Sequence, residues 1–137
     1  MEHMKDPHVG SWKLNEAKSK FTPGTVKFTT IVYESVAANM KVTTHGIEAN
    51  GKTAHSEWSG KFDGKDYPVT GRPNQDTRSC VKVNDRTLEF TARKNGKVTV
   101  TGLSLVSADG TSCSVTATGI TPEGKEFKHV TVYDKMP

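Results

Sequence analysis

The residues best suited to acid–base chemistry in this 137-residue sequence are a few histidines, one glutamate, one arginine and one tyrosine. Histidine titrates near neutral pH, so it could exchange protons with a substrate. Glu57 follows His55 by two positions, and such residues share one face of a strand. An arginine could stabilise a developing oxyanion. If the protein is an enzyme, the predicted catalytic residues are His55, Glu57, Arg93, His129 and Tyr133.

The same histidines have a second interpretation. His45, His55 and His129 all fall on the polar side of predicted strands, next to Thr and Lys. Alternating polar residues of this kind are typical of a wall that faces water. The sequence favours this interpretation, in which the histidines do not share a cavity.

The sequence supports metal or cofactor chemistry less than it supports acid–base chemistry. The pair His55 and Glu57 supplies two potential ligands, whereas a zinc site needs three or four. Cys80 and Cys113 lie far apart, outside any Cys-x-x-Cys motif, which argues against a zinc site. The sequence favours two buried free thiols and leaves a disulfide between them open, since a disulfide depends on the distance between the two residues in the fold. No phosphate loop, dinucleotide fingerprint or Gly-x-Ser-x-Gly elbow occurs in the sequence. We therefore predict no metal site and no cofactor.

The elements that would position these residues are strands. Short Thr-rich, β-branched runs recur between turn signals such as Asn50-Gly51, Asn95-Gly96 and Asp109-Gly110. Ten strands are predicted, near 9–15, 26–34, 39–47, 53–62, 66–70, 77–83, 87–94, 97–106, 111–119 and 126–134. A single helical turn is expected within 15–20. Strand twist accumulates along such a meander until it closes. The predicted fold is a single all-β, antiparallel up-and-down barrel of eight to ten strands.

Aromatic and sulfur-containing side chains on the apolar faces of these strands are candidates for ligand contact. A barrel of this size is either packed solid or encloses a pocket for one small molecule, and such pockets are lined by apolar and aromatic groups. Trp58 is the first candidate, followed by Met40 and Phe90, and Phe28 belongs to the same set.

The longest polar interruption, 70–80, predicts a loop at the rim of the barrel. Within it, Asp76 and Arg78 could pair with each other or meet a ligand at the opening. A solvated loop with a turn-fixing aspartate is the interpretation that the sequence favours.

The two ends of the chain resemble a known group of barrels. The motif "VGSWKL" at 9–14 is similar to the Gly-x-Trp first strand of the calycins, which include lipocalins and intracellular fatty-acid-binding proteins. "VTVYDKM" at 130–136 resembles the last strand of the latter. "GSWKLNEAKSKFTPG" and "FDGKDYPVTGRPNQDT" resemble small bacterial lipocalin-like proteins with no settled function. The resemblance implies that Gly10 and Trp12 are structural, with the indole packed across a closed base.

Two departures from the fatty-acid-binding proteins matter. The segment 14–27 is too short for their helix-turn-helix lid. Their last strand carries Arg-x-Tyr, whereas Thr131 and Tyr133 stand here, so a fatty-acid carboxylate clamp is in doubt. The resemblance would turn Thr131 and Tyr133 inward and make Tyr133 a ligand contact, whereas apolar alternation would turn Val130 and Val132 inward. The orientation of this strand is left open.

Composition limits the kinds of partner and the number of domains that we expect. The formal charge is +4, but its basic residues are scattered among acidic ones, so a nucleic-acid partner is not expected. No apolar stretch is long enough for a membrane-spanning helix. The start is polar and unlike a signal peptide, which fits a cytoplasmic protein or a mature periplasmic or secreted form. We predict a polar tail or cloning remnant at 1–8 and one calycin-like domain at 9–137.

Together these observations favour a non-catalytic barrel that binds a small hydrophobic or amphipathic molecule. The alternative is an enzyme, an isomerase, cyclase or lyase, that uses polar residues of the same cavity for proton transfer. A structural module with a filled barrel is a third possibility. Residue types alone do not indicate the ligand, the compartment or the oligomeric state.

Overall fold

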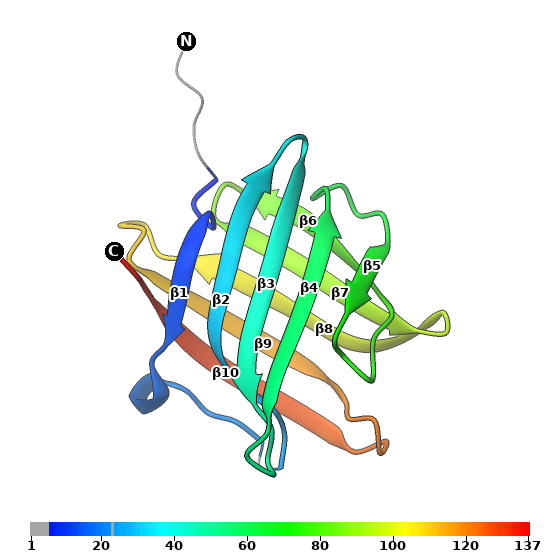
Figure 1. The fold of residues 1–137 in the computed structure, drawn as a ribbon. Coiled ribbons are helices and arrows are strands. Elements are labelled where there is room, and N and C mark those ends of the chain that lie inside the picture. Colours follow the sequence, from blue (N-terminus) through cyan, green and yellow to red (C-terminus); the bar gives the residue numbers. More distant parts are fainter. Residues whose placement is uncertain (1–5, 23) are drawn as a thin grey trace.

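A computed structural model describes residues 6–22 and 24–137. Ten antiparallel strands form a closed barrel in which each strand pairs with its neighbours in sequence, and β1 pairs with β10 (Figure 1). The strands are β1 (Gly10–Leu14), β2 (Lys27–Val36), β3 (Asn39–Ile47), β4 (Thr53–Gly60), β5 (Tyr67–Thr70), β6 (Thr77–Asn84), β7 (Thr87–Lys94), β8 (Lys97–Val106), β9 (Ser112–Ile120) and β10 (Glu126–Lys135). A single 3₁₀ turn, η1 (Glu16–Lys18), follows β1. The predicted fold class is therefore confirmed.

The barrel closes where the two ends of the sheet meet. Trp12 lies opposite Lys135 across the β1–β10 pair, and Leu14 lies opposite Tyr133. On its other side, β1 pairs with β2. Closure leaves the sheet without an exposed edge, which would otherwise be free to pair with another chain.

The two ends of the barrel differ in their connections. We call the end that carries residues 6–9, 37–38, 61–66, 85–86 and 107–111 the base, and the end that carries 15–22, 24–26, 48–52, 71–76, 95–96 and 121–125 the mouth. Apart from the β1–β2 connection these loops are short, and those at the mouth add residues to the interior that the strands enclose.

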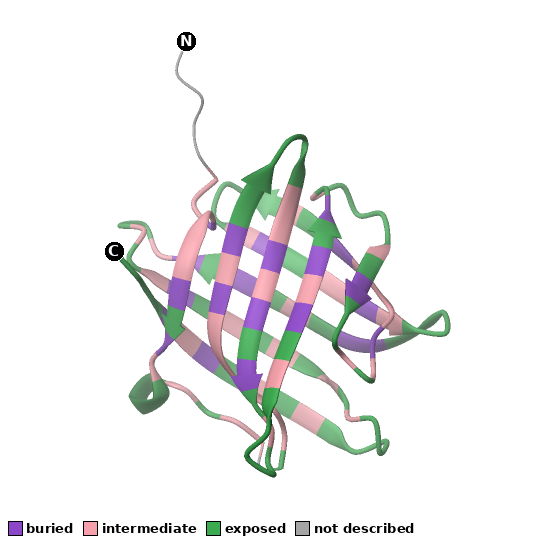
Figure 2. Cartoon of the chain, in the orientation of Figure 1, coloured by how far each residue is buried: buried purple, intermediate pink, exposed green. Residues whose placement is uncertain are grey.

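Burial alternates along the strands, as Figure 2 shows for β2, β3 and β4. On β10, Thr131 and Tyr133 are 4% and 3% exposed, whereas Val130 is 38% exposed. The inward orientation of Val130 and Val132 is therefore wrong, and the orientation implied by the calycin resemblance is the observed one. The inward polar groups find partners: the Thr131 hydroxyl donates to the Val115 carbonyl (3.2 Å) and the Tyr133 hydroxyl to the Phe28 carbonyl (2.8 Å).

The base is sealed by Trp12, which is 1% exposed. Its indole N–H donates to the His8 carbonyl at 2.9 Å, and the His8 side chain is fully buried. His8 Nε2 lies 3.1 Å from Ser104 Oγ. His8 therefore belongs to the packed part of the chain although the sequence placed it in the tail. The rest of that predicted tail, 1–5, lies outside the described residues.

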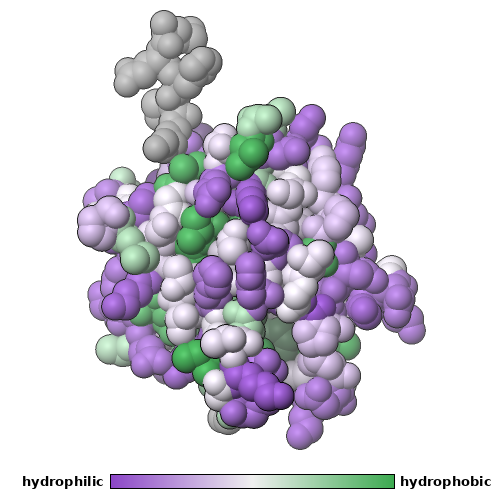
Figure 3. Space-filling model, in the orientation of Figure 1, coloured by the Kyte–Doolittle hydropathy of each residue, from purple (hydrophilic) through white to green (hydrophobic). Residues whose placement is uncertain are grey.

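The outer surface is mixed, with hydrophilic side chains over most of the face drawn in Figure 3 and hydrophobic ones scattered among them. Cys80 and Cys113 are buried free thiols, as predicted. Among residues 6–22 and 24–137, no helix is long and apolar enough to cross a membrane.

Candidate functional site

A cavity of about 780 Å³ occupies the barrel interior. It extends from Leu88 and Ser104, towards the base, to the mouth loops at 24–26, 48–50, 71–75 and 121–123. A volume of this size falls in the range of sites for drug-sized molecules. The barrel is therefore not packed solid.

Small inward residues leave this space unfilled. Ala54 and Ala117 line the cavity on β4 and β9. Gly102 faces inward on β8, and a Cβ there would lie 2.3 Å from Cζ of Phe90. Phe90 therefore owes its position in the cavity wall to the missing side chain at 102.

The 71–76 loop is tied across part of the mouth. The Asn74 amide donates to the Ile120 carbonyl at 2.9 Å, and the Thr99 hydroxyl donates to the Asn74 carbonyl at 2.7 Å. At the start of the loop Gly71 has a φ of +86°, and a Cβ there would lie 1.9 Å from the His55 carbonyl oxygen. Glycine is required at this close approach, and it allows the loop to turn the next residue, Arg72, into the cavity.

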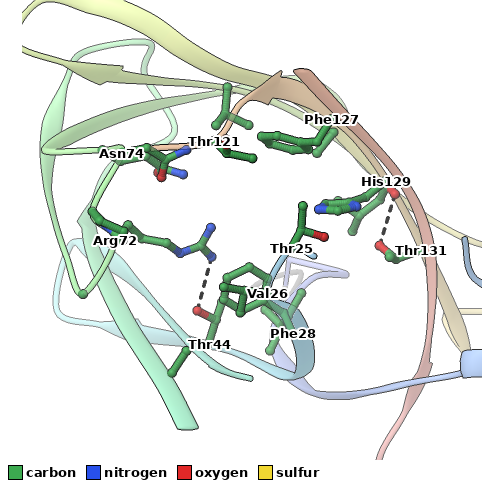
Figure 4. Close-up of a pocket in the computed structure, with 18 of the residues that line it drawn as sticks. Thr25, Val26, Phe28, Thr44, Arg72, Asn74, Thr121, Phe127, His129 and Thr131 are labelled. Atoms are coloured by element: carbon green, nitrogen blue, oxygen red, sulfur yellow. Dashed lines mark hydrogen bonds between the residues drawn. The ribbon is translucent and has the colours of Figure 1, made fainter. Parts of the chain in front are cut away.

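The Arg72 side chain reaches towards the middle of the cavity, with Phe127 and His129 on the opposite side (Figure 4). Its Nε donates to Ser56 Oγ at 3.1 Å and its Nη2 to Thr44 Oγ1 at 3.3 Å. Its Cζ lies 3.9 Å from the centre of the Phe28 ring, a cation–π contact. Burial, and secondly the charge of Arg78, lower the pKa of the Arg72 guanidinium.

Arg78, from β6, is the second cation of the cavity wall, and like Arg72 it is half-buried. Its Nη2 donates to Gln75 Oε1 at 3.0 Å, and its Cζ lies 5.1 Å from the centre of the Phe90 ring. Its Nε is buried and has no hydrogen-bond partner among the described residues. Burial also lowers the pKa of this guanidinium.

His129 and Tyr133 bring the last strand into the site. The His129 ring packs against Phe21 and Phe127, with centroid distances of 5.5 and 4.8 Å. Burial, and secondly the charge of Arg72, lower the pKa of His129. Burial raises the pKa of Tyr133 to about 12, so its hydroxyl is protonated at neutral pH.

Most of the side chains proposed from the sequence as ligand contacts line this cavity. Phe28, Trp58, Phe90 and Tyr133 all do so. The Trp58 indole N–H is already engaged, donating to the Arg78 carbonyl at 2.8 Å. Met40 does not line the cavity: it lies near the base end of β3 and packs against the buried core.

The residues proposed for catalysis do not converge. Glu57 forms an ion pair with Lys41 (3.2 Å) and Arg93 with Asp66 (2.7 Å), and these carboxylates are 45% and 42% exposed. His55 is exposed, with its ring 4.8 Å from that of His45 on the neighbouring strand. Of the predicted set, His55, His129 and Tyr133 belong to the cavity lining, but Glu57 and Arg93 do not.

Sequence reasoning missed Arg72 and treated Arg78 as a minor possibility. Arg72 stands in a polar loop, where an arginine is ordinarily solvated, and its burial depends on the turn at Gly71 and on the tie between Asn74 and Ile120. A usable signal for Arg78 was strand alternation, because Arg78 and Cys80 share the inward face of β6. Among residues 6–22 and 24–137, no cluster of three or more metal-ligating side chains occurs.

The comparisons with known proteins bear on the fold. No family model and no curated protein matches this chain. Among solved structures, it is similar to a redesigned β-barrel, mFAP1, bound to DFHBI, with a TM-score of 0.54 and 11% sequence identity over 94% of this chain and 95% of that one. At this identity the likeness supports the barrel fold alone.

Proposed function

We propose that this protein binds a small amphipathic molecule inside the barrel, without catalysing a reaction. The observation that carries the proposal is the cavity of about 780 Å³ that extends to the mouth loops. Its wall combines aromatic side chains such as Phe28 and Phe90 with a few inward polar groups, which is how small-molecule sites are built. A barrel of similar fold was solved bound to DFHBI, which fits this proposal.

The enzyme alternative has weaker support. This alternative needs His55, Glu57 and Arg93 to meet inside the cavity. They do not, because Glu57 and Arg93 form ion pairs at the surface. A protonated Tyr133 hydroxyl that donates to a backbone carbonyl is already engaged. Binding therefore fits the geometry better than proton transfer does.

We also propose that the domain at 9–137 is a calycin-like barrel. Supporting this kinship are the Gly-x-Trp at 10–12, with its indole buried at the base, and the inward Tyr133 on the last strand.

Binding can be tested with N-phenyl-1-naphthylamine, a neutral apolar dye whose fluorescence rises in apolar surroundings. We expect saturable binding at one site. Ala117→Phe places a ring in the cavity, and Thr118→Phe places the same ring on the exposed side of β9. The first variant should abolish dye binding and the second should leave it intact. Equal binding by both variants would remove the cavity as the site.

A further inference from the structure

We propose that the ligand carries an oxyanion head group, which Arg72 and Arg78 hold inside the cavity. This inference rests on the binding function proposed above and narrows it to one chemical class. The head group is a carboxylate, sulfate or phosphate attached to an apolar body.

The first argument is the charge of the site. Arg72 and Arg78 both lie in the cavity wall, and neither forms an ion pair with a carboxylate of the described residues. Both guanidinium groups are half-buried and so partly withdrawn from water, which is costly for a charge unless it is paired. Moreover, these two cations repel each other, since the charge of Arg78 disfavours the charged form of Arg72. A bound anion would relieve both penalties at once.

The second argument concerns unused hydrogen-bond donors. A guanidinium has five N–H donors, and Arg78 directs one side-chain hydrogen bond, to Gln75, within the described part of the chain. Its Nε is buried and unpartnered. Buried polar atoms without a partner are uncommon and call for an explanation. An oxyanion accepts two such donors side by side.

The third argument is the position of the acidic residues. The carboxylates of the cavity lining belong to Glu48 and Glu123, which stand in turns at the mouth. Neither forms an ion pair with Arg72 or Arg78.

Aromatic rings lie beside both cations: Arg72 Cζ lies over the Phe28 ring and Arg78 Cζ over the Phe90 ring. Arg72 Nη1 and Arg78 Nε and Nη1 make no hydrogen bond within the described part of the chain, so N–H groups of both guanidinium groups are available to an acceptor.

This arrangement differs from the one that the resemblance implies. Fatty-acid-binding proteins meet a carboxylate with Arg-x-Tyr on the last strand, and Thr131 occupies the position of that arginine here. The two cations instead come from the 71–76 loop and β6. The charge is therefore placed on a different part of the wall.

The test compares dodecanoate, dodecyl phosphate and dodecan-1-ol at pH 7.5 as displacers of N-phenyl-1-naphthylamine, with the two anions below their micelle concentrations and the alcohol below its solubility limit. We expect at least one anion to bind about tenfold or more tightly than the alcohol, because charge-assisted hydrogen bonds contribute that much. The phosphate and carboxylate arms then distinguish the two head groups. Equal affinity for all three would overturn the proposal while leaving the binding function intact.

Variants assign the preference to the two arginines. Arg72→Met and Arg78→Met should each lose most of the preference for the anion, measured in each variant as the ratio of anion affinity to alcohol affinity. Arg93→Met, which removes an arginine from the outer wall, should keep the preference. An unchanged preference in both cavity variants contradicts the proposal, and so does a matching loss of alcohol and anion affinity. If neither the dye nor any of the three dodecyl compounds binds, both the proposed function and this inference are overturned.

Discussion

The base and the mouth of the barrel differ in how their charged side chains are paired. At the base, the Asp6 carboxylate pairs with Lys82, and His8 Nδ1, which lies 3.4 Å from an Asp6 oxygen, has no hydrogen-bond partner among the described residues. At the mouth, Arg72 and Arg78 are half-buried in the cavity wall with no carboxylate partner in the described residues. The charges of Asp6 and Lys82 at the base are therefore paired, whereas the mouth keeps two cations without an ion-pair partner.

This difference indicates where binding and stability are separated in the fold. Unpaired buried charges and empty space both reduce stability, and both occur on the mouth side. Sites that reduce stability in this way are typical of function. Substitutions at the base should therefore destabilise the protein, whereas substitutions of the mouth arginines should not.

The largest expected effect comes from Trp12→Ala. This substitution removes a fully buried indole and leaves a cavity at the base, so the free energy of unfolding should fall by about 3–5 kcal/mol. Urea denaturation followed by circular dichroism measures the loss. Trp12→Phe keeps part of the packing and should lose less. A fall below about 1 kcal/mol for the alanine variant would contradict the assignment of Trp12 as the residue that seals the base.

Asp6 should make the base sensitive to acid. Burial raises the pKa of its carboxyl, but hydrogen bonds from His8 and Lys82 outweigh burial and lower the pKa to about 2. Since the folded-state pKa lies below the unfolded value near 3.9, this stabilisation is complete above about pH 4 and is lost as the pH falls towards 2. Its size is about 2–3 kcal/mol, since each pKa unit corresponds to about 1.4 kcal/mol. The difference between wild-type and Asp6→Asn unfolding free energies should shrink over this pH range, and a constant difference would disprove the coupling.

The third prediction is that a substitution at the mouth does not lower the free energy of unfolding. Arg72→Met should leave the ligand-free protein equally stable or more stable, by about 1 kcal/mol, because it removes a half-buried charge that has no ion-pair partner in the described residues. The hydroxyls of Thr44 and Ser56 keep a partner, since they also bond to each other. Thermal unfolding without ligand measures the change. A loss of more than about 1 kcal/mol would show that Arg72 serves the fold, and the contrast between base and mouth would fail.

The sequence predicted the barrel well because strands and turns leave local signals. Asn95-Gly96 marks the β7–β8 turn, and there both residues have the positive φ that the motif indicates. The alternation Leu88, Phe90, Ala92 correctly predicted the inward face of β7. These features depend on neighbours a few residues apart, so local reasoning is sufficient for them.

The site was harder to predict because its contacts are not local. On β10, apolar alternation favoured Val130, but Thr131 and Tyr133 face inward because carbonyls on β9 and β2 accept their hydroxyls. Likewise, the buried position of Arg72 depends on its contacts with Thr44 and Ser56. Such partners come from other strands, and their position becomes known once the barrel is closed.

The smallest expected effect is a change in the pKa of His129, which tests directly whether the charge of Arg72 acts inside the cavity. Burial is the main reason that its pKa is lowered, and the positive charge of Arg72 adds to it. Arg72→Met removes that charge, so the pKa of His129 should rise while burial keeps it below its ordinary value. Titration of the ring protons by NMR, with His129→Gln to assign the resonance, follows this change. If the pKa does not move, Arg72 does not act electrostatically across the cavity, and the argument that its charge is available to an anion there loses its support.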